Sequence, residues 1–121
     1  MIGIGVDLCE VPRMRTTLAR TPGVARRVFT EGERVYCERR RDPTERYAAR
    51  FAAKEAVMKA MGVGLGAFGF HDVEVVKARS GAPSVRLSGK AQALAASLGV
   101  REWRLTLTHT ATLAEAIAVA L

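Results

Sequence analysis

The segment DPTERYAARFAAKEAVMKAMG, residues 42–62, carries the strongest helix signal in the chain. It is rich in Ala, Arg, Lys, Glu and Met, which all favour the α-helix, and Gly62 supplies a natural C-terminal stop. At the other end, Asp42, Pro43 and Glu45 form a start similar to a capping box. The sequence therefore predicts one long helix over this segment.

The N-terminal segment MIGIGVDLCEV, residues 1–11, has the alternating pattern of a β-strand. Its aliphatic side chains are Ile2, Ile4, Val6 and Leu8, and they alternate with Gly3, Gly5 and Asp7. Because successive side chains of a strand point to opposite faces, we expect Asp7 to face away from the aliphatic side. Asp7 should also lie near the end of this strand.

The rest of the chain reads as short helices and strands. Pro12 favours the first turn of a helix over residues 12–20, and Thr30 with Glu33 predicts a capped helix that reaches about Glu38. After a glycine-rich loop, the patterns predict strands near 73–75 and 85–87, a helix at 88–98 and a strand at 103–108. The tail at 113–121 has the alanines of a helix but the period of a strand, and we favour the strand. This mixture indicates an α+β fold with the long helix packed on a mostly antiparallel sheet.

Length and composition point to one folded domain over residues 1–121. Hydrophobic residues make up 49% of the chain and charged residues 26%, a composition that can bury a core. No apolar run is long enough to span a bilayer, and Asp7 interrupts the stretch where a signal peptide would be apolar. We therefore expect a cytoplasmic protein without a membrane partner. Cys9 and Cys37 form no paired motif and should be free thiols, buried or half-buried.

The net charge of +7 favours a polyanionic partner. Nucleic acid, a nucleotide cofactor and an acidic protein all satisfy this condition. Charge alone does not choose among the three.

Three side chains have the chemistry of a metal-dependent phosphate site. Glu55 and Lys59 are four residues apart on one face of the long helix, and Asp7 emerges from the first strand. Two carboxylates suit Mg²⁺, which commonly binds one or two carboxylates together with phosphate oxygens. Spacing alone also allows Glu55 and Lys59 to be an ordinary exposed ion pair on the helix surface.

Two motifs in combination carry a family resemblance. GxDxxxxxR contains Gly5, Asp7 and Arg13, and some forty residues later FxxKExxxK contains Phe51, Lys54, Glu55 and Lys59. Together they resemble the paired signatures of the phosphopantetheinyl transferase superfamily, and the short chain is similar to its holo-acyl-carrier-protein synthase branch. The resemblance continues through Gly62, Gly64, Gly66, Phe70, Asp72, Val73, Gly81, Pro83, Thr108 and His109.

The resemblance implies a role for each matched residue. Asp7 and Glu55 would hold Mg²⁺, Lys59 would meet the coenzyme A diphosphate, and these three would form the catalytic group. Arg13 would face the carrier protein. The coenzyme A contacts would be completed by Arg46, Arg50, Gly81, Pro83 and His109. Two positions depart from the family pattern, because Ala82 replaces the Lys of many relatives and Thr108 replaces their Ser.

The function implied by the resemblance is transfer of 4′-phosphopantetheine from coenzyme A to a serine of an acyl carrier protein of fatty-acid or polyketide synthesis. A homotrimer is also implied, with Trp103, Leu105 and Leu107, or the C-terminal tail, as candidates for its central contact. The chief alternative is a basic nucleic-acid-binding domain, which the low aromatic content of 6% does not favour. The other alternative is a relative that binds coenzyme A without turning it over. We therefore expect a transferase without a nucleic-acid partner.

Overall fold

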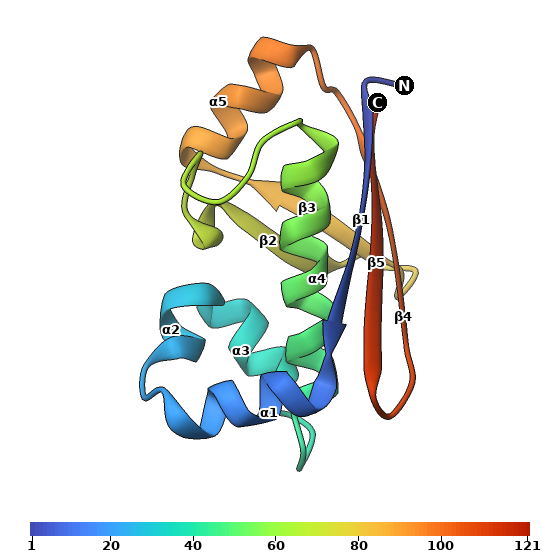
Figure 1. Ribbon diagram of the computed structural model, residues 1–121. Helices are drawn as coiled ribbons and strands as arrows, with labels where there is room; N and C mark the ends of the chain where they lie inside the picture. The colour runs from blue at the N-terminus through green and yellow to red at the C-terminus, as the bar shows by residue number, and fades with distance from the viewer.

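The protein, described over residues 1–121 by a computed structural model, has one central helix between a three-stranded sheet and a two-stranded hairpin (Figure 1). The helices are α1 (Val11–Arg20), α2 (Val24–Val28), α3 (Glu31–Cys37), α4 (Thr44–Ala60) and α5 (Gly89–Leu98), with a 3₁₀ turn, η1, at Phe70–Asp72. The strands are β1 (Gly3–Glu10), β2 (Val73–Lys77), β3 (Pro83–Leu87), β4 (Trp103–His109) and β5 (Leu113–Ala120). The predicted α+β class is confirmed.

The larger sheet is antiparallel and has the strand order β1-β5-β4. The tail is therefore its central strand, and the period of two in that segment outweighs the helical preference of its alanines. Ala114, Ala116, Ala118 and Ala120 are fully buried against the interior. Small side chains on this inner face allow α4 to lie close to the sheet.

The two glycines at the start of β1 make the same close packing possible. A Cβ atom on Gly3 would lie 1.8 Å from the Ala60 carbonyl oxygen, and one on Gly5 would lie 2.0 Å from that of Ala56. No real Cβ tolerates such distances. Helix α4 therefore contacts the backbone of β1, an edge strand of the sheet, directly at these two glycines.

The opposite side of the sheet, which we call the outer sheet face, is apolar and uncovered. Ile4, Val6 and Leu8 are 59%, 49% and 55% exposed. The register pairs Ile4 with Val119 and Val6 with Ile117, so β5 extends the same face. Asp7 faces away from this aliphatic side, which confirms the predicted orientation.

The apolar side chains of β4 point the other way from the outer sheet face. Trp103, Leu105 and Leu107 pair in register with Ala120, Ala118 and Ala116 and pack against the core. They are half-buried rather than fully covered, so their expected part in a contact between subunits stays a prediction. The outward-facing residues of the C-terminal tail also remain candidates for the contact between subunits.

Local differences from the sequence prediction lie at helix ends and short turns. Helix α4 begins at Thr44 without a capping box, because Asp42 accepts hydrogen bonds from the backbone N and Oγ1 of Thr44 instead. The capping box of Thr30 and Glu33 is present as predicted. Helix α2 and turn η1 were not predicted, since each is too short to show a period. None of the helices has the length and apolar character needed to cross a bilayer.

Candidate active site

Three of the predicted site residues meet where α4 passes β1. Lys59 Nζ donates a hydrogen bond to Asp7 Oδ1 at 2.9 Å and another to the Val6 carbonyl oxygen at 3.1 Å. Glu55 lies one turn before Lys59 on the same face of α4. The Asp7 side chain is 19% exposed and Lys59 is 53% exposed, so the group opens to solvent. Glu55 and Lys59 are therefore more than a pair along one helix, since Lys59 also contacts a distant strand.

Burial and the Asp7 carboxylate both act on Glu55. Burial, followed by repulsion from Asp7, raises the pKa of Glu55 from its usual value, while Lys59 acts in the opposite direction. The hydrogen bond to Asp7 and the Asp7 charge raise the pKa of Lys59. Negative charge thus gathers beside one ammonium, in a place where a cation would be favoured.

Asp7 and Glu55 have the ligand chemistry that Mg²⁺ needs. Both offer hard carboxylate oxygens, and no group of three or more His, Cys, Asp or Glu side chains gathers anywhere in the chain. Two carboxylates alone cannot fill the coordination sphere of a metal ion. They do suit Mg²⁺, which keeps several waters and takes substrate phosphate oxygens. The residues present therefore fit this ion.

A second set of predicted residues lines a cavity of about 200 Å³. Arg46 and Arg50 from α4, Gly81 and Pro83 from the hairpin, and His109 from β4 all contribute to its wall. Sequence reasoning missed the three further polar members, which are Tyr36, Arg40 and Lys77. The basic run at 39–41 was a possible signal for Arg40, whereas Tyr36 and Lys77 join the cavity only through folding. We call this cavity the arginine pocket.

Cations in the arginine pocket surround one aromatic ring. The guanidinium carbons of Arg46 and Arg50 each lie 4.1 Å from the Tyr36 ring centroid, and Lys77 Nζ lies 5.1 Å from it. Partial burial acts to raise the pKa of the Tyr36 phenol, but Lys77, Arg46 and Arg50 outweigh burial and lower it. Arg50 is 6% exposed, and its Nε has no hydrogen-bond partner. The pocket therefore has unused capacity for an anion.

His109 is held at the edge of the arginine pocket by a contact with Glu45. Its Nδ1 lies 2.9 Å from Glu45 Oε2 at the start of α4. The register of β4 with β5 puts His109 on the inner face with Trp103. His109 is thus a surface-accessible imidazole beside a carboxylate rather than a buried core residue.

The carboxylate group and the arginine pocket lie on different sides of α4. At about 100° per residue, Arg46 and Glu55 are about 180° apart around the helix, and so are Arg50 and Lys59. The alanines between these two sides face the sheet. Within one chain, the two groups of residues therefore face away from each other across the helix.

A third cavity, of about 640 Å³, lies between β1 and helices α1 and α2. Its lining is mostly apolar, and Glu10 and Arg13 are its charged members. Cys9 also lines it, and burial followed by the Asp7 charge raises the pKa of this thiol. A thiol with a raised pKa is a poor nucleophile, so the cavity is better suited to apolar contact than to covalent chemistry. Cys37 is buried, and both cysteines are free, as predicted.

Comparison with known proteins agrees with this arrangement. A family model described as the 4′-phosphopantetheinyl transferase superfamily matches residues 3–113. The chain belongs to this superfamily. Within it, the chain is 48% identical over 120 residues to the holo-[acyl-carrier-protein] synthase of Frankia casuarinae, covering 99% of this chain and 97% of that one. Membership of the holo-[acyl-carrier-protein] synthase branch makes the chain an enzyme that transfers phosphopantetheine.

Solved structures of holo-[acyl-carrier-protein] synthases share the fold. The enzyme from Neisseria meningitidis superposes with a TM-score of 0.89 at 27% identity, covering 100% of this chain and 98% of that one. The enzyme from Helicobacter pylori, solved in complex with coenzyme A, gives a TM-score of 0.84 at 27% identity, with 98% and 99% covered. The fold predicted from the motifs is therefore that of the synthase family. Because the family consists of enzymes, the non-enzymatic alternative based on net charge is set aside.

Proposed function

We propose that this chain is a Mg²⁺-dependent transferase that moves 4′-phosphopantetheine from coenzyme A to a serine of an apo-acyl carrier protein, releasing adenosine 3′,5′-bisphosphate. The observation that carries the proposal is the meeting of Asp7, Glu55 and Lys59 at the contact between β1 and α4. Two carboxylates beside one ammonium form a site for a cation and a diphosphate together. Coenzyme A, as bound by the Helicobacter pylori relative, has that diphosphate.

The chemistry is displacement at phosphorus. The serine oxygen forms a bond to the phosphorus that carries the pantetheine arm, and the bond from that phosphorus to adenosine 3′,5′-bisphosphate breaks. Asp7 and Glu55 would hold Mg²⁺, which supplies neutralisation of the diphosphate charge. Lys59 offsets the charge that grows on the leaving group, and most of the catalysis comes from such positioning and charge stabilisation.

The serine proton needs an acceptor near the carboxylate group. Glu55 belongs to that group, and a carboxylate within hydrogen-bond reach of the serine hydroxyl, directly or through one water, can act as the base. His71 does not compete, because its ring nitrogen contacts the Arg26 carbonyl oxygen. We assign Glu55 as the proton acceptor.

The arginine pocket is proposed to bind the nucleotide portion of coenzyme A. Arg46 and Arg50 present guanidinium groups without a carboxylate partner, which suits phosphate oxygens. The ring of Tyr36 and the turn of Gly81 and Pro83 complete the wall.

A homotrimer would bring the two halves of the site together. The carboxylate group and the arginine pocket face opposite sides of α4. A coenzyme A molecule that contacts the carboxylate group of one subunit must therefore contact the arginine pocket of another subunit. The outer sheet face of Ile4, Val6, Ile117 and Val119 is an apolar surface of the kind that subunit contacts cover. We propose three such subunits, with one site at each boundary.

The carrier protein is proposed to dock over the third cavity. Arg13 gives its rim a positive charge, and an acidic carrier would be attracted to it. The apolar floor below Arg13 would receive apolar side chains of the carrier.

A cytoplasmic location agrees with the two free thiols, because disulfides are rare in that compartment.

Incubation of the protein with Mg²⁺, coenzyme A and an apo-carrier protein tests the proposal. Mass spectrometry of the carrier should find the phosphopantetheine arm, and chromatography should find adenosine 3′,5′-bisphosphate in equal amount. Transfer that is unchanged by chelation of Mg²⁺ would remove the metal from the proposal. Absence of transfer, with coenzyme A still bound, would favour the non-catalytic alternative.

A further inference from the structure

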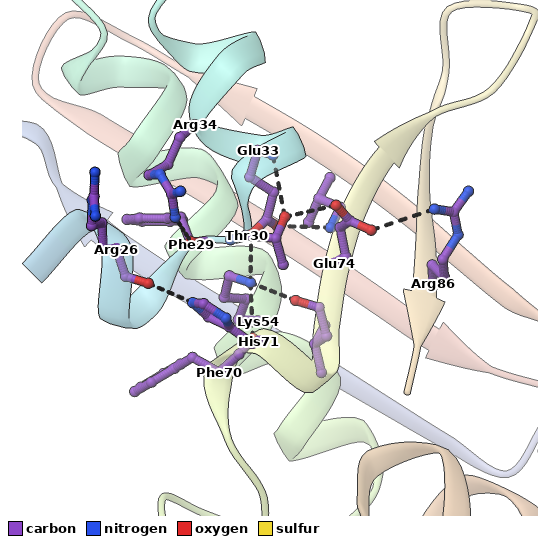
Figure 2. A network of polar contacts seen from close by, with 12 residues as sticks. Arg26, Phe29, Thr30, Glu33, Arg34, Lys54, Phe70, His71, Glu74 and Arg86 are labelled. Carbon is purple, nitrogen blue, oxygen red and sulfur yellow. Dashed lines mark hydrogen bonds and ion pairs between the residues drawn. The ribbon is translucent and has the colours of Figure 1, made fainter. Parts of the chain in front are cut away.

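Lys54 and Glu33 form an ion pair in the interior of the protein (Figure 2). Lys54 Nζ lies 2.7 Å from Glu33 Oε1, and both side chains are completely buried. Lys54 is part of the FxxKExxxK motif, yet it points to neither the carboxylate group nor a cavity. Burial lowers the pKa of Lys54, and the Glu33 charge opposes that change.

Both charged groups are fully engaged with backbone atoms of neighbouring elements. Lys54 donates to the carbonyl oxygens of Phe70, at 2.9 Å, and Val73. Glu33 Oε2 accepts from the backbone N of Val75 at 2.8 Å, and Oε1 accepts from that of Thr30 at 2.9 Å. The pair therefore joins α3, α4, η1 and β2 by directional bonds, and Figure 2 shows these elements around it.

The same three main elements build the cation cluster of the arginine pocket. Tyr36 lies one turn after Glu33 on α3, and Arg50 lies one turn before Lys54 on α4. Lys77 lies two residues after Val75 on β2, which is on the same face of the strand. Glu33, Lys54 and Val75 thus each have a pocket residue as a neighbour on the same face of the same element.

Without a bound anion, the pocket carries unbalanced positive charge. None of the ion pairs in the structure joins Arg46, Arg50 or Lys77 to a carboxylate. Repulsion between the two guanidinium groups on α4 and Lys77 on β2 favours separation of these two elements. The bonds from Lys54 and Glu33 to the β2 backbone oppose that separation, and an apolar pair would lack this directionality.

We propose that Lys54 and Glu33 are positioning residues for the arginine pocket. They hold Tyr36, Arg50 and Lys77 at the spacing at which these residues receive the phosphate-bearing nucleotide part of coenzyme A. The free-energy cost of bringing the cations together is then part of folding rather than of binding. The pocket therefore binds the nucleotide more tightly. This inference rests on the proposed function of the pocket.

Charge removal from the pair tests the inference. The main variant is Glu33→Gln/Lys54→Met, which leaves no unpaired buried charge, and Lys54→Met alone is its companion. Titration calorimetry with adenosine 3′,5′-bisphosphate in the absence of Mg²⁺ should show affinity weakened about tenfold or more in the double variant. The KM for coenzyme A should rise similarly, while kcat and the KM for carrier protein change by less than about threefold.

A matched control separates positioning from general stability. Val11→Ala removes a fully buried side chain at the start of α1, an element that contributes no residue to the buried pair, its bonds or the lining of the arginine pocket. It should lower the melting temperature but leave nucleotide affinity unchanged. Nucleotide affinity that is equally unchanged in the double variant would overturn the inference and leave the pair a purely structural one.

Two other outcomes are also informative. A fall in kcat with altered Mg²⁺ dependence, at constant nucleotide affinity, would mean that the pair acts on Glu55 instead, and would overturn the inference as well. If Lys54→Met fails to fold, the double variant decides, because it contains no buried unpaired charge. Failure of the unsubstituted protein to bind nucleotide would reject the proposed function itself.

Discussion

The backbone of Gly5 lies directly against the backbone of Ala56. A Cβ on Gly5 would be 2.0 Å from the Ala56 carbonyl oxygen and 2.8 Å from the backbone N of Ala60. Asp7 is two residues farther along the same face of β1, and Lys59 is one turn farther along α4. The close approach at Gly5 is what allows Lys59 to reach Asp7 at 2.9 Å.

Substitution Gly5→Ala should therefore destabilise the protein by about 3 kcal/mol or more, because the methyl group collides with helix backbone that cannot rotate away. Thermal unfolding measures the effect. Gly64→Ala is the matched control, since a Cβ at Gly64 would meet nothing within 4 Å. Equal melting temperatures for the two variants would contradict the close approach of β1 and α4.

Asp7→Ala and Glu55→Ala should each lower the transfer rate by about a hundredfold or more while leaving the fold intact, because each removes a ligand oxygen from the proposed metal site. Rates are measured at saturating coenzyme A over a range of Mg²⁺ concentrations. Glu102→Ala, which removes an exposed carboxylate beside Arg104, should have no effect. Near-normal turnover by either site variant at modest Mg²⁺ would remove that residue from the metal site.

Arg13→Glu should raise the KM for carrier protein about tenfold or more and leave the KM for coenzyme A nearly unchanged, because Arg13 lies at the rim of the apolar cavity. Arg101→Glu makes the same charge change at an exposed position between α5 and β4 and serves as control. Added salt should mimic the Arg13 variant, since the Debye length is only about 8 Å at physiological ionic strength. A KM for carrier protein that does not depend on salt would count against electrostatic docking.

Asp42 should contribute stability that disappears in acid. Hydrogen bonds from Thr44, together with Arg15, lower the pKa of Asp42 from 3.8 to about 2 in the folded state. The stabilisation is therefore complete above the unfolded pKa and is lost as pH falls through the folded pKa.

The variant Asp42→Asn tests this linkage by urea unfolding between about pH 5 and pH 2. The gap in unfolding free energy between the unsubstituted protein and the variant should narrow as the pH falls. A gap that stays constant over this range would show that the Asp42 charge is not responsible.

Mixed subunits should complement each other if the site is shared. Asp7→Ala damages the carboxylate group, and Arg46→Ala damages the arginine pocket on the other side of α4. After unfolding and refolding together, some boundaries would pair two intact halves, so activity should exceed the sum of the separate variants. Sedimentation of a fully active monomer would refute the shared site. A trimer that shows no complementation would leave the proposed trimer standing. It would reject only the proposal that two subunits share each site.

Much of the local structure was predictable from sequence, because local structure depends on neighbouring residues. The long helix, the alternation in β1 and the capping box of Thr30 and Glu33 follow from propensity and spacing. The short elements α2 and η1 were missed, and the start of α4 was misplaced at Asp42. Such features depend on single hydrogen bonds, as from Thr44 to Asp42, rather than on a repeated pattern.

The sequence by itself determined the family, through the motifs around Asp7 and Glu55, and determined which side chains share a face of each element. Only the tertiary structure decided which face is covered: Leu105 lies against the core, whereas Val6 stays exposed. It also decided that Tyr36 joins the arginine pocket and that Lys54 meets Glu33. The physical reason is that periodicity is a property of a few consecutive residues, while burial and ion pairing depend on which distant segments fold together.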